Sequence, residues 1–156
     1  DRSVLADASR SGITFGWRLH HRPADELFAA IEGTGFQTRI ILERMAEYGV
    51  PVTRVINAGG VPQRNAPLNR VYASILGKPI LVPEADTTSL GAAIFAFLAA
   101  GTFATVEEAQ AALCPSYRVF EPDAEAQRAY RPWFELFARV YFSEELASIL
   151  GDLQRH

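Results

Sequence analysis

The stretch best suited to chemistry is a glycine pair, Gly59 and Gly60, that follows a short run of β-branched residues. Residues 52–56 have the composition of a strand, and a helical pattern begins past Asn65. In a strand–turn–helix arrangement, backbone N–H groups and a helix N-terminus can contact an anion. Glycine also permits positive φ and lets a ligand lie against the main chain. Most such pairs are only turns, so the local pattern alone favours a structural turn over a binding site.

Composition excludes several classes of function. The chain of 156 residues is 49% hydrophobic and 21% charged, which is typical of one soluble globular domain. A net charge of −3 with scattered Lys and Arg predicts no nucleic-acid or membrane partner. No apolar run reaches the roughly 20 residues that span a bilayer. Cys114 is the only cysteine, which is compatible with a reducing cytoplasm. The chain starts without Met on an already patterned sequence, so we expect a piece of a longer protein.

Two other groups of polar residues could take part in chemistry. His20 and His21 lack a neighbouring acidic or Ser partner, so a solvated loop is favoured over a catalytic role. Glu84 and Asp86 follow a predicted strand, near where ligands bind in open α/β sheets. We interpret both as helix-capping or loop residues.

The elements that must position the glycine turn alternate along the chain. The patterns predict strands at 12–16, 52–56 and 79–82, and helices at 23–48, 65–76 and 89–100. Alternation of this kind predicts an α/β layer with helices covering a sheet. A capped short helix from Thr105, an extended segment at 117–120 and a last helix follow. We therefore divide the chain into a core at 1–104 and a helical tail at 105–156 that packs on it.

The helix predicted at 23–48 begins at Pro23 and ends before Gly49. Its expected buried stripe is Leu27, Ala30, Ile31, Thr34, Thr38, Ile41, Leu42 and Met45. Gly33 and Gly35 lie inside the helix, where each costs about 1 kcal/mol relative to Ala. Close packing or a ligand cleft along this backbone would account for them equally well.

Small or aromatic residues mark two later helices. Small residues in the helix at 89–100 predict close approach to another element: Gly91, Ala92, Ala93 and Ala96. An aromatic stripe in the last helix favours core packing over a stacking platform: Tyr130, Trp133, Phe134, Phe137 and Tyr141. Pro132 should kink or restart that helix.

Three motifs occur in a characteristic order: Ala58-Gly-Gly-Val-Pro-Gln-Arg-Asn65, Val71-Tyr-Ala-Ser-Ile-Leu-Gly-Lys-Pro79 and Ser89-Leu-Gly-Ala-Ala-Ile-Phe95. With Ala99-Ala-Gly101, they resemble the C-terminal domain of the FGGY family of carbohydrate kinases. Residues 2–7, 12–16, 34–39 and 120–122 resemble the ribulokinases within that family. The resemblance covers nearly the whole chain.

The resemblance implies an ATP-dependent sugar kinase with the actin/hexokinase/Hsp70-like (ribonuclease H-like) fold. In that family two domains close over a cleft, and the N-terminal one binds the sugar and supplies the catalytic Asp. The glycine turn of the C-terminal domain holds the adenosine end of the nucleotide. We therefore expect no catalytic residue in this chain, and no activity from it alone.

By position, the resemblance assigns nucleotide contact to Gly59 and Gly60 and an adenine-side role to Arg64 and Asn65. Family members often have Ser or Asn in place of Arg64, and usually Asp in place of Ser74. The implied cofactors are ATP and Mg²⁺, with the metal held mainly by the nucleotide and the missing domain. No metal ligand is assigned to this chain.

The implied reaction converts L-ribulose to L-ribulose 5-phosphate in L-arabinose catabolism, in the cytoplasm, by a protein that could be a homo-oligomer. Alternatives are an FGGY kinase for xylulose, glycerol or another polyol, and a non-catalytic nucleotide-binding or structural module. A Rossmann dinucleotide site is disfavoured because the third glycine and the following acid are missing.

Overall fold

The computed structural model describes residues 4–7 and 11–154, so the motif at 2–7 lies partly outside the described residues. The helices are α1 (Pro23–Glu47), α2 (Gly60–Arg64), α3 (Ala66–Leu76), α4 (Thr87–Ala99), α5 (Val106–Leu113), α6 (Ala124–Tyr141) and α7 (Glu144–Gln154). The strands are β1 (Val55–Ile56), β2 (Ile80–Pro83) and β3 (Tyr117–Phe120). Sequence patterns did not predict α2 or α7.

The three strands form a mixed sheet in the order β1-β2-β3. β1 pairs with β2 in parallel, with Val55 opposite Ile80, and β2 pairs with β3 antiparallel, with Ile80 opposite Phe120. Ile80 and Val82 of the central strand are completely buried. The expected α/β arrangement on a mixed sheet is confirmed, and β3, from beyond residue 104, completes that sheet.

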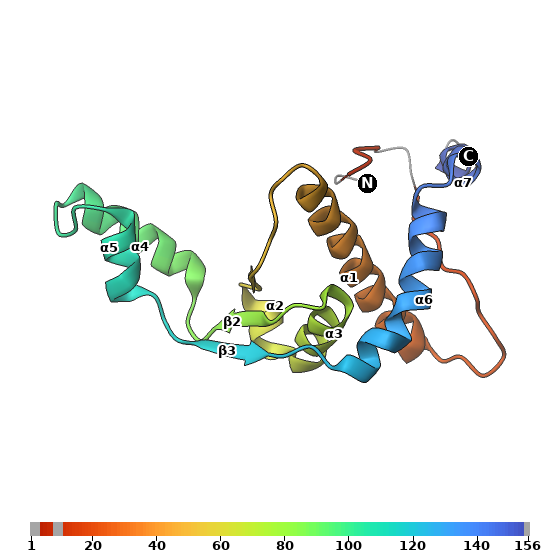
Figure 1. Ribbon diagram of the computed structural model, residues 1–156, viewed down its shortest axis with the longest axis horizontal. Helices are drawn as coiled ribbons and strands as arrows, with labels where there is room; N and C mark the ends of the chain where they lie inside the picture. The colour runs from red at the N-terminus through yellow and green to blue at the C-terminus, as the bar shows by residue number, and fades with distance from the viewer. Residues whose placement is uncertain (1–3, 8–10, 155–156) are drawn as a thin grey trace.

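α3 lies at the centre of the helical layer, in contact with both α1 and α6 (Figure 1). Its predicted stripe is confirmed, because Val71, Ile75 and Leu76 are all buried. These residues share one core cluster with Phe36, Ile40, Ala73, Ile80, Val82 and Phe134. The core thus joins α1, α3, β2 and α6.

Several helix ends follow local sequence signals. The backbone N–H of Arg22 donates to Asp25 Oδ2 at 2.7 Å at the start of α1. Gly49 and Gly77 have φ of 81° and 62° just after α1 and α3. Only glycine adopts this left-handed conformation without strain, so both helices end where the sequence predicts.

The stripe predicted along α1 is only partly right: Ile31 and Leu42 pack against the core, but Thr34 is exposed and the buried Phe36 and Ile40 were not in the prediction. Leu27 is 68% exposed and Met45 is 38% exposed, whereas Phe36 and Ile40 are buried. The buried residues of α1 all lie between 35 and 40 because α3 and α6 cover only the middle of this long helix.

The two glycines inside α1 have different surroundings. A Cβ atom added to Gly35 would lie 2.9 Å from Ile75 Cδ1, whereas one added to Gly33 would meet nothing within 4 Å. Close packing against α3 therefore accounts for Gly35. Packing does not account for Gly33.

The strand predicted at 12–16 is not formed, since that segment has no partner strand among the described residues. Ile13 and Phe15 are instead 45% and 60% exposed. An isolated extended segment cannot pair its backbone groups, so its β-like composition is not sufficient. α6 continues through Pro132 without restarting.

The aromatic stripe of α6 packs mainly into the core, as expected. Phe134 is buried, and Tyr130, Phe137 and Tyr141 pack against the core cluster. Trp133 is the exception, with 62% of its surface exposed. The prediction of core packing is therefore confirmed for four of the five rings.

α4 and α5 pack on each other and stand apart from α1, α3 and α6 (Figure 1). Ala109 is fully buried in this pair and Ile94 nearly so. The small residues of α4 do not make the predicted close approach: Gly91 has open space around it, and Ala92 and Ala96 are exposed. The α4 surface is left uncovered because no other described element packs across it.

A half-buried carboxyl and phenol link α1 to α6. Burial raises the pKa of Glu32, and a hydrogen bond from Tyr130 lowers it in part. Burial raises the pKa of Tyr130 to about 12, with further contributions from the hydrogen bond and the charge of Glu32. In the folded state Tyr130 therefore keeps its proton at pH values where the unfolded chain has lost it.

Replacing Gly35 by Leu should lower the free energy of unfolding by about 1–3 kcal/mol, because the side chain collides with Ile75. Gly33→Leu, the matched control on the same helix, should raise it by about 0.5–1 kcal/mol through helix propensity. Urea unfolding measures both, and equal effects would contradict the packing difference.

Tyr130→Phe should lower the free energy of unfolding by about 1 kcal/mol at pH 7, because Glu32 loses its hydrogen-bond donor. The folded state holds the Tyr130 proton more tightly than the unfolded state, so this group's contribution to stability falls as pH rises from about 10 to about 12. The variant lacks that fall. Its stability deficit, measured by urea unfolding from pH 7 to 11.5, should shrink above pH 10; a constant deficit would contradict the assignment.

Candidate functional site

The glycine turn presents open backbone. Gly59 has φ of 106° and ψ of 174°, whereas Gly60 is the first residue of α2 and does not have positive φ. A Cβ atom built on either glycine meets nothing within 4 Å. Positive φ is thus confirmed at Gly59 alone, and both residues leave room for a ligand against the main chain.

The helix that directly follows the glycines differs from the expected one. α2 has five residues, and the longer α3 starts only at Ala66. A single turn aligns few peptide dipoles, so an anion-binding helix N-terminus at the glycines is not formed. What the turn offers a ligand is its exposed backbone.

Arg64 and Asn65 lie at the junction of α2 and α3. Asn65 Oδ1 accepts a hydrogen bond from the backbone N–H of Leu68 at 3.0 Å, which confirms its predicted role as the N-cap of α3. Its side-chain oxygen is therefore occupied. Arg64 is exposed.

A buried amide holds the turn in place. Asn69 is completely buried, and its Nδ2 donates to the carbonyls of Pro62 at 2.7 Å and Asn65 at 3.1 Å. Its Oδ1 accepts from Asn57 Nδ2 at 3.0 Å. One side chain thus joins the end of β1, α2 and the start of α3.

Two further side chains fix α2 against the sheet. Gln63 Nε2 donates to the carbonyls of Ala85 at 2.7 Å and Pro83 at 3.3 Å, just after β2. Arg118 of β3 donates through Nη2 to the carbonyl of Gln63 at 2.8 Å. The turn is therefore preorganised by contacts to both β2 and β3.

Sequence reasoning missed Asn57, Gln63, Asn69 and Arg118. Asn69 carried a usable signal, since it is a polar residue beside the apolar stripe of α3. A buried amide must find partners, so such a position indicates a hydrogen-bond network. Arg118 carried none, because it lies 55 residues from Gln63 in the sequence.

Other candidate residues have structural roles. Asp86 caps α4: Oδ1 accepts from the backbone N–H of Thr88 at 3.0 Å and Oδ2 from Ser89 Oγ at 2.6 Å. These bonds lower the pKa of Asp86 below its ordinary value, led by the bond from Ser89. Glu84 accepts from the Ser116 hydroxyl. The predicted capping and loop roles are confirmed.

The remaining polar positions are also accounted for. His21 Nδ1 accepts from the backbone N–H of Arg18 at 3.0 Å in an exposed turn, in agreement with a loop role. Ser74 is buried and accepts from the backbone N–H of Asp123 at 3.3 Å, which ties α3 to the start of α6. Within the described ranges, no three His, Cys, Asp or Glu side chains are close enough together to hold a metal ion. Nor does any helix there have the length and apolarity needed to cross a bilayer.

Comparison with known proteins gives a consistent result. Residues 1–100 match the family described as the FGGY family of carbohydrate kinases, C-terminal domain. Ribulokinase from Staphylococcus aureus is 28% identical over 158 residues, which cover 99% of this chain and 29% of that protein. The chain thus spans about 29% of the length of the curated relatives it matches.

Solved structures of sugar kinases share the fold. A ligand-bound xylulose kinase from Lactobacillus acidophilus superposes with a TM-score of 0.81 at 21% identity, covering 97% of this chain and 30% of that one. Gluconate kinase from the same organism superposes with a TM-score of 0.78 at 20% identity, covering 94% of this chain and 29% of that one. Glycerol kinase from Plasmodium falciparum with ADP superposes with a TM-score of 0.63 at 23% identity, covering 83% of this chain and 26% of that one. The predicted actin/hexokinase-like fold is confirmed.

Asn69→Ala should lower the free energy of unfolding by about 2 kcal/mol or more, because it leaves buried partners without hydrogen bonds. Hydrogen exchange should quicken in α2 while β3 stays protected. Arg70→Ala, at the exposed neighbouring position, should change stability by less than about 0.5 kcal/mol. Unchanged exchange in α2 would show that Asn69 does not hold the turn.

Proposed function

Because this chain belongs to the FGGY family of carbohydrate kinases, we propose that it forms the nucleotide side of an ATP-dependent sugar kinase. The observation that carries the proposal is the open backbone at Gly59 and Gly60, held rigid by buried hydrogen bonds. Adenosine lies against this turn. The remainder of the longer protein supplies the sugar site and the carboxylate that deprotonates the sugar hydroxyl.

The turn contributes to catalysis through binding and orientation. Phosphoryl transfer depends mostly on positioning and charge stabilisation, and a rigid turn places the nucleotide without reordering at each cycle. Arg64 stacks on or hydrogen-bonds the base edge, and Asn65 Nδ2 remains available as a donor. The Gly59 conformation brings the ligand close to the main chain.

Mg²⁺ supplies charge neutralisation on the phosphates when the nucleotide is bound. The family resemblance supports a metal held mainly by the phosphate oxygens and by residues outside this chain. Glu84 and Asp86, which follow β2, already accept hydrogen bonds from the Ser116 and Ser89 hydroxyls.

For the substrate we propose L-ribulose, converted to L-ribulose 5-phosphate. Support comes from the similarity to Staphylococcus aureus ribulokinase over 99% of this chain. Xylulose, gluconate and glycerol kinases share the fold at lower identity, so their substrates are the alternatives. A ribulokinase would act in L-arabinose catabolism in the cytoplasm.

Gly60→Val in the full-length protein tests the nucleotide assignment. Gly60 has ordinary φ and open surroundings, so the protein should fold normally while the new side chain occupies the nucleotide's place. ADP affinity by calorimetry should fall at least about tenfold, or about 1.4 kcal/mol. Gly12→Val is the matched control, because Gly12 is equally open with ordinary φ and should leave ADP affinity unchanged.

Equal ADP affinity in the two variants would show that nucleotide binds elsewhere. A panel of L-ribulose, xylulose, gluconate and glycerol then tests the sugar, with kcat/KM expected to be highest for L-ribulose. Preference for another sugar would overturn the substrate but not the kinase assignment. ADP binding with no phosphorylation of any sugar would favour a non-catalytic nucleotide-binding module.

A further inference from the structure

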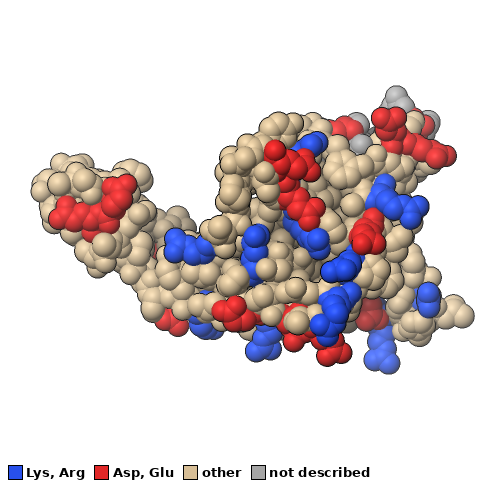
Figure 2. Space-filling model, viewed as in Figure 1, with Lys and Arg blue, Asp and Glu red and all other residues tan. Residues whose placement is uncertain are grey.

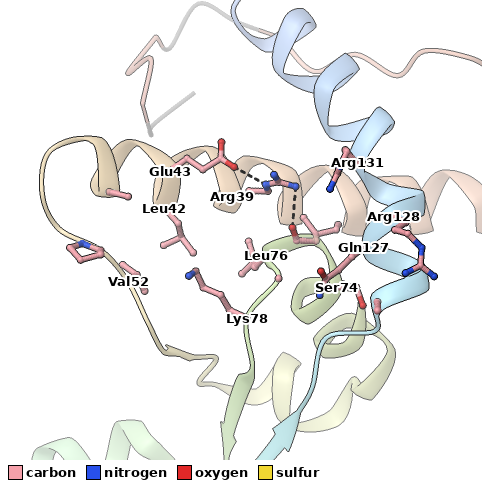
Figure 3. Close-up of a pocket in the computed structure, with 15 residues that line it drawn as sticks. Arg39, Leu42, Glu43, Val52, Ser74, Leu76, Lys78, Gln127, Arg128 and Arg131 are labelled. Carbon is pink, nitrogen blue, oxygen red and sulfur yellow. Dashed lines mark hydrogen bonds and ion pairs between the residues drawn. The ribbon is translucent and has the colours of Figure 1, made fainter.

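A hollow of about 510 Å³ lies between α1, the C-terminal end of α3 and the first turns of α6 (Figure 3). Lys78 on its wall precedes β2, whereas Gly59 follows β1. Since β1 and β2 are parallel, the hollow and the glycine turn lie at opposite ends of these strands. The volume suits a small organic molecule, and nothing in the proposed kinase function uses it.

The lining carries an excess of positive charge. Its cationic residues are Arg39, Lys78, Arg128 and Arg131, and its one acidic residue is Glu43. Arg39 Nε pairs with Glu43 Oε1 at 2.8 Å, and Arg39 also lies 3.8 Å above the Phe134 ring. The Glu43 charge is therefore already balanced, which leaves three cations.

Those three cations make no ion pair or side-chain hydrogen bond with any residue that the structure describes: Lys78, Arg128 and Arg131. Figure 3 shows the Lys78 ammonium directed into the hollow and Arg131 on the side of α6 that faces Arg39, whereas the Arg128 guanidinium projects away from Lys78. Arg128 and Arg131 are three residues apart on α6, so they share a face. Like charges that line one hollow repel each other, and a bound anion would offset this electrostatic repulsion.

This charge is local rather than a property of the whole chain, whose net charge is −3. Figure 2 shows several Lys and Arg side chains over α1, α3 and α6, with acidic side chains among them. A few cations on the lining of one hollow do not form the extended basic stripe of a nucleic-acid surface. The geometry favours a small anion.

The rest of the lining suits an organic phosphate. Leu42, Val52 and Leu76 form an apolar wall, and Gln127 adds an amide. Guanidinium groups bind phosphate oxygens through paired N–H donors, and lysine binds them as a compact charge. We propose that this hollow binds a small phosphate monoester, with the phosphate between Lys78 and Arg131 and the carbon skeleton against the apolar wall.

Equilibrium dialysis of the full-length protein with radiolabelled inorganic phosphate, at saturating ADP, tests this site. Lys78→Gln and Arg131→Gln should each weaken phosphate binding about tenfold, because each removes a charge-assisted hydrogen bond. Arg70→Gln, an exposed cation outside the hollow, is the matched control and should bind as the wild type does. Lys78→Arg retains the charge and should retain binding.

Thermal unfolding of each variant establishes that it is folded. No phosphate binding by the wild type at millimolar concentration would overturn the proposal. Equal phosphate binding by the glutamine variants and by Arg70→Gln would also overturn it. Loss of phosphate binding in Gly60→Val would assign the phosphate to the glycine turn instead. ADP affinity is measured separately, so failure of this site leaves the kinase assignment intact.

Discussion

The carboxamide of Asn69 is completely buried and bonds to Asn57, Pro62 and Asn65, which belong to three successive segments. A buried amide stabilises a fold only when its donors and acceptor are all used, and here both hydrogens and the oxygen have partners. The end of β1 and the start of α3 are therefore held at a fixed separation with α2 between them. Gly59, with φ of 106°, connects the end of β1 to α2 across this separation. The open backbone at the turn is thus a consequence of the buried hydrogen bonds that Asn69 makes.

α3 connects the two candidate sites of the molecule. Its N-terminal turn holds Asn65 and Asn69 beside the glycines, and its C-terminal end leads to Lys78 at the cationic hollow. The helix is 11 residues long, or roughly 16 Å, and its buried residues lie between Asn69 and Leu76. Core packing of α3 therefore fixes the separation between the glycine turn and the cationic hollow.

Local signals predicted the features that depend on a few neighbouring residues. Asn65, Asp86 and Gly77 cap helices as their residue types indicate, and the α3 stripe is buried as its period indicates. The failures involve partners distant in sequence. Segment 12–16 has strand composition but no neighbouring strand, and Leu27 lies beyond the reach of α3 and α6. The resemblance assigned Gly59, Gly60, Arg64 and Asn65 to the nucleotide site, which stays a prediction. The hydrogen bonds around them join segments that are distant in the sequence, so local patterns could not predict them.

The chain leaves the sheet after β2, forms α4 and α5, and returns as β3 at nearly the same point. Glu84 N–H donates to the Ser116 carbonyl at 3.1 Å, and the Ser116 hydroxyl donates back to the Glu84 carboxylate. The two ends of this excursion are thus fastened together independently of what lies between them. The entropy of closing such a loop changes only slowly with its length. Related sequences can therefore lengthen, shorten or exchange the α4–α5 pair while β2 and β3 stay in register. We expect this pair to be the part of the fold that varies most between them.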